Sequence, residues 1–131
     1  MKTIYVIDDE IMITELLDAC LSRIYKIIIF NDPSMALKEF TKDIYIPDCI
    51  ISDITMPKLN GIELVLEIRL LRMDIPIILM TGKQLPIEIS NFPMIASIIK
   101  PFSLLCLKKI VHESVYPNIP FIEVENIIGN L

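Results

Sequence analysis

Short apolar runs along the chain alternate with segments whose apolar residues recur every three or four positions. The short runs are rich in isoleucine and valine, and charged or turn residues separate them. Such runs are typical of strands in a parallel sheet that helices cover on both faces. The pattern predicts five strands: Thr3–Ile7, Lys26–Phe30, Cys49–Ser52, Ile75–Met80 and Ala96–Ile99.

Helices are expected between these strands. In the first, Ile13, Leu16, Leu17 and Cys20 repeat at i, i+3, i+4 and i+7, which is the spacing of one helical face. A serine or aspartate before the first helical residue, and a proline at it, favour helix starts. The first helix is expected over Ile11–Leu21, and the second starts at Pro33 behind an Asp32 N-cap and ends before Asp43. The third follows Gly61 and runs to about Arg72. The last runs from a Ser103 N-cap to about Val115, with Leu104, Leu107 and Val111 on one face.

The segment from Gln84 to Ile95 departs from this regularity. Pro86 can open a helix, but Pro93 cannot lie in its interior, so we expect a shortened or irregular fourth helix. Alternating strands and helices imply right-handed crossovers between parallel strands. The sequence therefore predicts a doubly wound α/β fold around a five-stranded parallel sheet.

Composition narrows the classes of protein to consider. Hydrophobic residues make up 53% of the 131 residues, yet no apolar run reaches the roughly 18 residues of a membrane-spanning helix. The chain enters its first strand almost at once, with a single Lys2 and no small-residue cleavage site, which favours a cytoplasmic protein without a secretory signal. A net charge of -5 disfavours direct binding of nucleic acid.

The three cysteines do not suggest a disulfide framework or a zinc site. Cys20, Cys49 and Cys106 are odd in number and widely spaced, and each lies inside an apolar segment. We expect them to be buried, reduced thiols.

Chemically active side chains follow four of the predicted strands. Asp8 and Asp9 end the first strand, Asp53 the third, Thr81 the fourth and Lys100 the fifth. The carboxyl ends of parallel strands meet at one edge of the sheet, where sites of this fold class form. These five side chains are therefore expected to converge.

A cluster of three carboxylates requires a positive charge. Two carboxylates 4 Å apart repel by roughly 4 kcal/mol at an effective dielectric constant near 20. Mg²⁺ suits the cluster because it prefers oxygen ligands and takes one or two carboxylates together with phosphate oxygens. Asp53, on the central strand, is the candidate nucleophile toward phosphorus, while Lys100 and Thr81 can bind phosphoryl oxygens.

These residues resemble the response-regulator receiver domains of two-component signalling. The resemblance covers Lys2 to about Val115 and rests on four motifs: Ile7-Asp8-Asp9-Glu10, Asp53-Ile54-Thr55-Met56-Pro57-Lys58-Leu59-Asn60-Gly61, Thr81-Gly82 and Lys100-Pro101-Phe102. It implies a flavodoxin-like strand order 2-1-3-4-5 and a receiver domain over residues 1–115. It also implies that the Lys100–Pro101 bond is cis.

The resemblance further implies how the site works. Asp9 and Asp53 would ligate Mg²⁺ directly, Asp8 partly through water, and the Thr55 carbonyl would add a ligand. Asp53 would accept a phosphoryl group from a histidine kinase, a phosphotransfer protein or a small phosphodonor, and the protein would be a phosphoacceptor rather than an enzyme. A downstream effector, or a second copy that binds on phosphorylation, would receive the output.

Two features depart from the family pattern, and both concern output. Ser97 stands three residues before Lys100, where relatives commonly carry an aromatic side chain, and the fourth helix is bounded by prolines. Residues 116–131 form a tail that is either a short amphipathic helix or a linker. His112 is expected to be a solvated surface residue.

Other interpretations stay open. Asp8 and Asp9 could instead be acids that favour the start of a helix. Thr81 and Gly82 could form an ordinary turn, and Lys100 could be a surface lysine in a loop. The main rival function is a receiver-like interaction module that does not depend on phosphorylation. A Mg²⁺-dependent phosphohydrolase is a further rival, but that chemistry usually requires Asp-x-Asp and a capping insertion, whereas these two acids are adjacent.

Overall fold

The computed structural model describes residues 1–122 except residues 43, 45 and 58. Five strands alternate with five helices along the described chain. The strands are β1 (Thr3–Ile7), β2 (Lys26–Phe30), β3 (Cys49–Asp53), β4 (Ile77–Thr81) and β5 (Ile95–Ile99). The helices are α1 (Ile11–Leu21), α2 (Pro33–Thr41), α3 (Gly61–Leu71), α4 (Ile87–Ser90) and α5 (Leu104–Val115).

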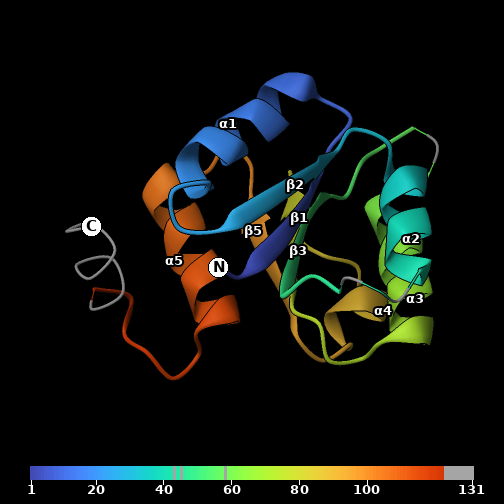
Figure 1. Ribbon diagram of the computed structural model, residues 1–131. Helices are drawn as coiled ribbons and strands as arrows, with labels where there is room; N and C mark the ends of the chain where they lie inside the picture. Colours follow the sequence, from blue (N-terminus) through green and yellow to red (C-terminus); the bar gives the residue numbers. More distant parts are fainter. Residues whose placement is uncertain (43, 45, 58, 123–131) are drawn as a thin grey trace.

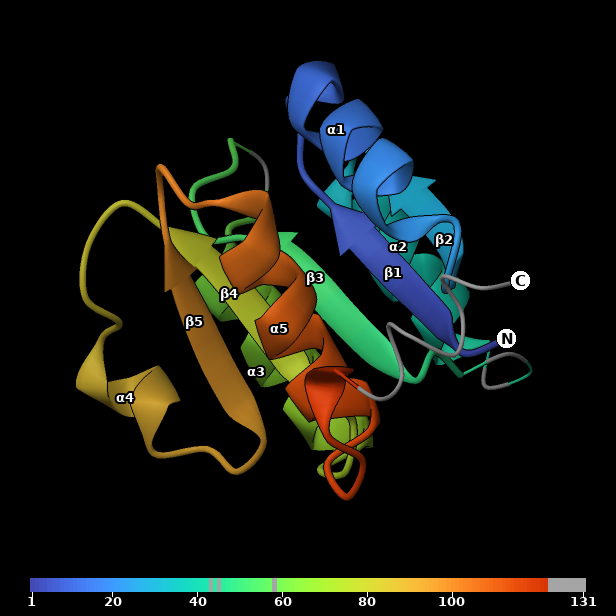
Figure 2. The same ribbon diagram turned by 90° about the vertical axis from the view of Figure 1, so that its left-hand side faces the viewer.

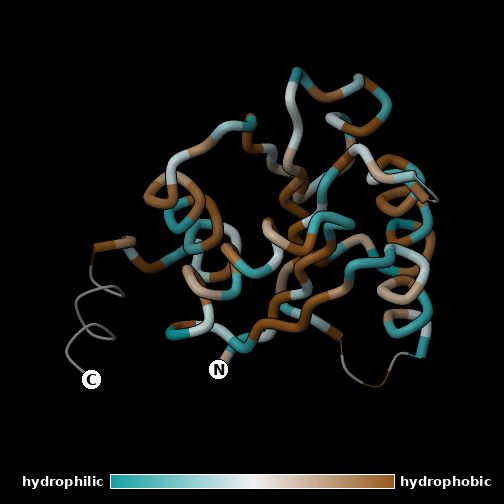
Figure 3. Tube along the Cα trace, turned by 90° about the horizontal axis from the view of Figure 1, so that it is seen from above, coloured by the Kyte–Doolittle hydropathy of each residue, from teal (hydrophilic) through white to brown (hydrophobic). Residues whose placement is uncertain are grey.

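The strands form one parallel sheet in the order β2-β1-β3-β4-β5, which confirms the predicted doubly wound fold. Helices α1 and α5 cover one face of the sheet, and α2, α3 and α4 cover the other (Figures 1 and 2). Two apolar clusters fill the space between these layers. In Figure 3 the strands in the middle of the molecule are mostly hydrophobic.

Alternation along each strand divides its side chains between the two clusters. Ile4 and Val6 of β1 face the α1 and α5 cluster, whereas Tyr5 and Ile7 face the α2 and α3 cluster. All four are at most 2% exposed, as expected for a strand covered on both faces. Because the strands are parallel and paired in register, their carboxyl ends meet at one edge of the sheet.

The predicted start of β4 is two residues early. Pro76 has no N–H to give to a ladder, and the paired strand begins after it at Ile77. The prediction of a short fourth helix is confirmed, because α4 has only four residues. The N-caps predicted at Asp32 and Ser103 are also confirmed, since their side chains accept hydrogen bonds from Ser34 N and Cys106 N.

The apolar faces of two helices differ from the prediction. Leu16 is 44% exposed, and Thr14, Leu17 and Leu21 are the buried residues of α1. Thr14 can replace a hydrophobic residue there because its hydroxyl is hydrogen-bonded within the helix, to Ile11 O at 3.0 Å. In α5, the predicted core residue Leu104 is 41% exposed because it lies at the first turn, at the rim of the layer.

The predictions for the cysteines and His112 were partly wrong. Only Cys49 is fully buried, whereas Cys20 is half-buried and Cys106 is exposed on α5. Burial raises the pKa of the Cys49 thiol to about 12. His112 is 2% exposed, not solvated, because the chain after α5 folds back and brings Ile119 O within 2.6 Å of Nε2.

The beginning of the tail packs on the domain. The ring of Tyr116 lies 5.4 Å from that of His112, and Phe121 meets the same imidazole edge-on at 5.5 Å. The prediction of an amphipathic helix further along falls on residues 123–131, which lie outside the described residues. In the part of the chain that the structure describes, no helix is long and apolar enough to cross a membrane.

Candidate metal and phosphoryl site

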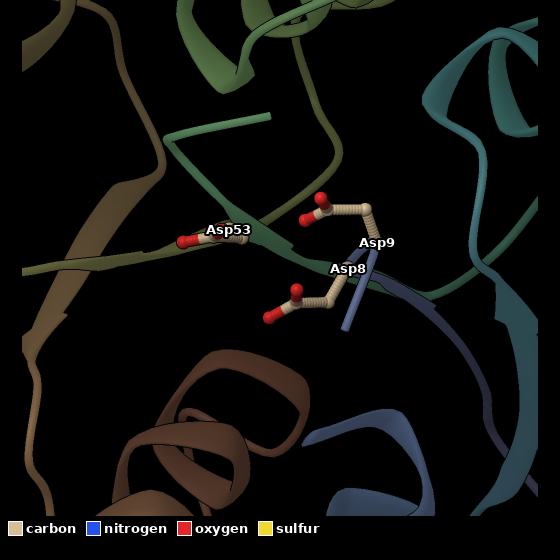
Figure 4. Close-up of side chains that lie close together, drawn as sticks. All are labelled: Asp8, Asp9 and Asp53. Atoms are coloured by element: carbon tan, nitrogen blue, oxygen red, sulfur yellow. The ribbon is translucent and has the colours of Figure 1, made fainter. Parts of the chain in front are cut away.

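Three carboxylates meet at the carboxyl edge of the sheet. Asp8 and Asp9 follow β1, and Asp53 ends the adjacent strand β3. One carboxylate oxygen from each lies within 4.8 Å of the others, and Figure 4 shows the three side chains together. Asp8 is fully buried, Asp53 is 5% exposed and Asp9 is open to solvent. The cluster is thus closed at its base and accessible from outside.

Asp8 is the most constrained of the three acids. Its Oδ1 accepts a hydrogen bond from the Glu10 backbone at 2.9 Å, while its buried Oδ2 has no hydrogen-bond partner among the described residues. Burial, with a further contribution from Asp53, raises the pKa of Asp8 to about 6. An oxygen held in this way suits a hard cation or its bound water, because all the ligand atoms offered are oxygens.

Lys100 supplies a positive charge to the cluster. Its Nζ lies 3.1 Å from Asp53 Oδ1 and 3.6 Å from Asp8 Oδ2. Burial opposes the charge, but the hydrogen bond and attraction to Asp53 outweigh it and raise the pKa of Lys100. The backbone N–H of Lys100 donates to Thr81 O at 2.7 Å, and the Lys100–Pro101 bond is cis, as expected.

Thr81 lies at the predicted edge, but its hydroxyl is engaged elsewhere. Oγ1 donates to the Lys83 carbonyl at 2.7 Å and accepts from the Lys83 N–H at 3.1 Å. The side chain is therefore tied to the loop between β4 and α4 instead of to Asp53. Thr55 lies in the exposed loop after β3, and it lines a cavity together with Thr81 and Gly82.

Gly61 has a role in the site that the sequence did not reveal. A Cβ at this position would lie 2.6 Å from the Asp53 carbonyl oxygen and 2.6 Å from Ile54 Cα. The Gly61 N–H also donates to Ile54 O at 2.9 Å. The start of α3 thus packs directly on the backbone that carries Asp53. Its place in the motif was visible, but this close approach depends on the tertiary structure.

Comparisons with known proteins agree with this geometry. The chain is 39% identical over 83 residues to the alkaline phosphatase synthesis transcriptional regulatory protein PhoP of Bacillus subtilis, covering 63% of this chain and 34% of PhoP. A probable transcriptional regulator ycf27 of Guillardia theta is 38% identical over 82 residues, covering 62% of this chain and 31% of the relative. The chain therefore spans about a third of the length of these relatives.

Solved structures show the same fold. The response regulator TrrA of Thermotoga maritima, in complex with Mg²⁺ and BeF, is 35% identical with a TM-score of 0.75, over 87% of this chain and 99% of TrrA. The chemotaxis protein CheY4 of Vibrio cholerae is 26% identical with a TM-score of 0.76, over 87% and 98% of the two chains. A family profile described as response regulator receiver domain matches residues 4–112. The chain belongs to the response regulator receiver domain family.

Proposed function

We propose that this receiver domain accepts a phosphoryl group on Asp53 in a Mg²⁺-dependent reaction. The observation that carries the proposal is the setting of the Asp53 carboxylate. It is 3.1 Å from the Lys100 ammonium group and shares a cluster of oxygen ligands with Asp8 and Asp9. A nucleophile, a cation site and a fixed positive charge therefore meet at one point.

Each residue of the cluster has a separate role in the proposed reaction. Asp9, Asp53 and the Thr55 carbonyl would hold Mg²⁺, with Asp8 acting partly through water. When bound, the ion supplies positive charge that offsets the acids and the transferring phosphoryl group. Lys100 supplies a second positive charge from the protein itself, beside the attacking oxygen.

The reaction exchanges one bond to phosphorus for another. An Asp53 oxygen attacks, a P–O bond forms, and the P–N bond of a phosphohistidine, or the P–O bond of a small phosphodonor, breaks. The electron pair of that bond leaves with the imidazole or with the donor's oxygen. We propose that Lys100 then binds one phosphoryl oxygen and that the Thr81 hydroxyl leaves the Lys83 carbonyl to bind another.

The partners follow from this chemistry. A histidine kinase or phosphotransfer protein would supply the phosphoryl group, and a downstream effector or a second copy would read the result. We propose residues 1–115 as the receiver domain, residues 116–131 as its tail, and the cytoplasm as its location. Ser97 is exposed on β5 and α4 has one turn, so output is either muted or carried by another surface.

Labelling of Asp53 tests the proposal. The intact protein is incubated with acetyl phosphate, with and without Mg²⁺, and the mass gain is measured for the wild type and Asp53→Asn. Asp48→Asn is the matched control, because Asp48 lies beside the opposite end of β3. The wild type and the control should gain one phosphoryl group only with Mg²⁺. Equal labelling of Asp53→Asn would refute the assignment, and absence of labelling throughout would favour the phosphorylation-independent module.

A further inference from the structure

The turn that carries the two adjacent acids is bound to the neighbouring strand by a side chain outside the acidic cluster. Asn31, the residue after β2, donates from Nδ2 to the Asp8 carbonyl at 2.9 Å and to Thr14 Oγ1 at 3.0 Å. A carbonyl oxygen can only accept, so the amide nitrogen must face it, and the two amide hydrogens serve the two acceptors. Asn31 thus connects the start of the loop between β1 and α1 to the first turn of α1.

Both residues that Asn31 contacts are fixed by further hydrogen bonds. The Asp8 N–H donates to Phe30 O at 3.1 Å, just beyond the last paired residues of β1 and β2. In α1, Thr14 is 1% exposed and its hydroxyl donates to Ile11 O at 3.0 Å. The Thr14 oxygen is therefore oriented to accept from Asn31.

The bond to the Asp8 carbonyl bears directly on Asp9. The carbonyl of Asp8 and the N–H of Asp9 belong to one planar peptide, so fixing the first fixes the direction in which the second leaves the strand. The carboxylates of the cluster repel one another when no cation is bound, and this repulsion favours a turn that opens. Asn31 opposes that opening from the β2 side.

We infer that Asn31, together with Thr14, is a positioning residue that holds the Asp8 and Asp9 turn in the geometry for binding a divalent cation. The inference rests on the Mg²⁺ site of the proposed function. Neither residue is among the proposed ligands: Asn31 acts through the Asp8 carbonyl, and Thr14 acts through Asn31.

Calorimetric titration of the intact protein with MgCl₂ tests the inference. Asn31→Ala removes both donors and should weaken Mg²⁺ binding about 10-fold, the low end for residues that orient metal ligands. Asn31→Leu keeps much of the side-chain volume but has no hydrogen-bond donors, so it should lose as much Mg²⁺ affinity as Asn31→Ala. Thr14→Val should weaken Mg²⁺ binding less than Asn31→Ala does. The variant with both changes should lose less affinity than the two single losses together, because both changes remove the bond between Asn31 and Thr14.

A matched control separates positioning from helix stability. Thr41 in α2 makes the same kind of hydroxyl bond three residues back, to Lys38 O at 2.8 Å, far along the chain from the acids. Thr41→Val should leave Mg²⁺ affinity unchanged. In the metal-free protein, the amide NMR signals of Asp9 and Glu10 should shift in Asn31→Leu and not in the control.

The outcomes are distinct. If folded Asn31→Ala and Asn31→Leu keep Mg²⁺ affinity within about twofold of the wild type, the inference is overturned. If the Asn31 variants do not fold, unchanged affinity in Thr14→Val overturns it. If the wild type itself does not bind Mg²⁺, the proposed metal site is refuted. If the wild type binds Mg²⁺ and the variants bind it equally well, only the role of Asn31 is refuted.

Discussion

Removing the charge of Asp8 should stabilise the metal-free protein. The Asp8 side chain is fully buried, and its pKa is raised from 3.8 to about 6, mainly by burial. At neutral pH, such a shift lowers the free energy of unfolding by about 3 kcal/mol relative to a protein in which Asp8 keeps its ordinary pKa. In Asp8→Asn, the amide oxygen can still accept from the Glu10 N–H. The amide nitrogen replaces Oδ2, which has no hydrogen-bond partner among the described residues but lies 3.6 Å from Lys100 Nζ, so the lost attraction to Lys100 offsets part of the gain. We expect Asp8→Asn to gain about 1 to 3 kcal/mol near pH 7.5.

The sign of the pH dependence follows from the same shift. The folded state binds the Asp8 proton more tightly than the unfolded state does, so stability from this group is fully present below the unfolded pKa of 3.8 and is lost as pH rises through about 6. Metal-free wild type should therefore become more stable as pH falls from about 7.5 to about 5. The stability of Asp8→Asn should not show this increase as pH falls.

Mg²⁺ should offset the stability advantage of Asp8→Asn over the wild type. At about one hundred times its dissociation constant, the ion stabilises the wild type by about 3 kcal/mol. Asp8→Asn should gain much less, because it lacks one of the charges that attract the ion. Urea unfolding followed by circular dichroism measures all these differences, since the chain has no tryptophan. A metal-free Asp8→Asn no more stable than the wild type near neutral pH would refute the reasoning.

Three further predictions concern the fold. Gly61→Ala should lose about 1 to 3 kcal/mol in urea unfolding, because its Cβ would meet the Asp53 carbonyl at 2.6 Å; stability equal to the wild type would contradict this contact. Arg69→Met should lose about 2 kcal/mol by the same assay, because the guanidinium of this 4% exposed residue donates to backbone carbonyls that would lose their partner. In the folded protein, a thiol reagent should modify exposed Cys106 quickly and buried Cys49 only after unfolding; simultaneous reaction would show that β3 is open.

The fold was largely predictable because its determinants are local. Apolar runs covered on both faces identify the strands, and Asp32 and Ser103 each cap a helix through their own side chains. The wrong predictions concern residues whose burial depends on segments that are distant in the sequence. Leu16 satisfies the helical spacing as well as Leu17 does, and only the packing of α1 on the sheet decides which is buried. His112 is buried by residues that follow it in the chain, and nothing in the sequence around it indicates their path.

The acidic cluster was predictable for a topological reason. Residues that follow β1 or end β3 must lie at one edge once the strands are parallel neighbours. The sequence could not show that Asp8 is buried while adjacent Asp9 is exposed, because that depends on which way each side chain leaves the turn. It also could not show that the Thr81 hydroxyl is bound to Lys83.

Under the proposed function, the hydrogen bonds between Thr81 and Lys83 would connect the phosphoryl site to the loop after β4. A phosphoryl group that recruits the Thr81 hydroxyl must replace its two hydrogen bonds to Lys83, so the loop after β4 is released as the phosphoryl group is bound. That loop leads into α4, which is one turn long and anchored by fully buried Ile89. A single turn has few backbone bonds to resist displacement. We therefore expect phosphorylation to shift the backbone amide NMR signals of the loop between β4 and α4, while buried Ile89 limits the displacement of α4 itself.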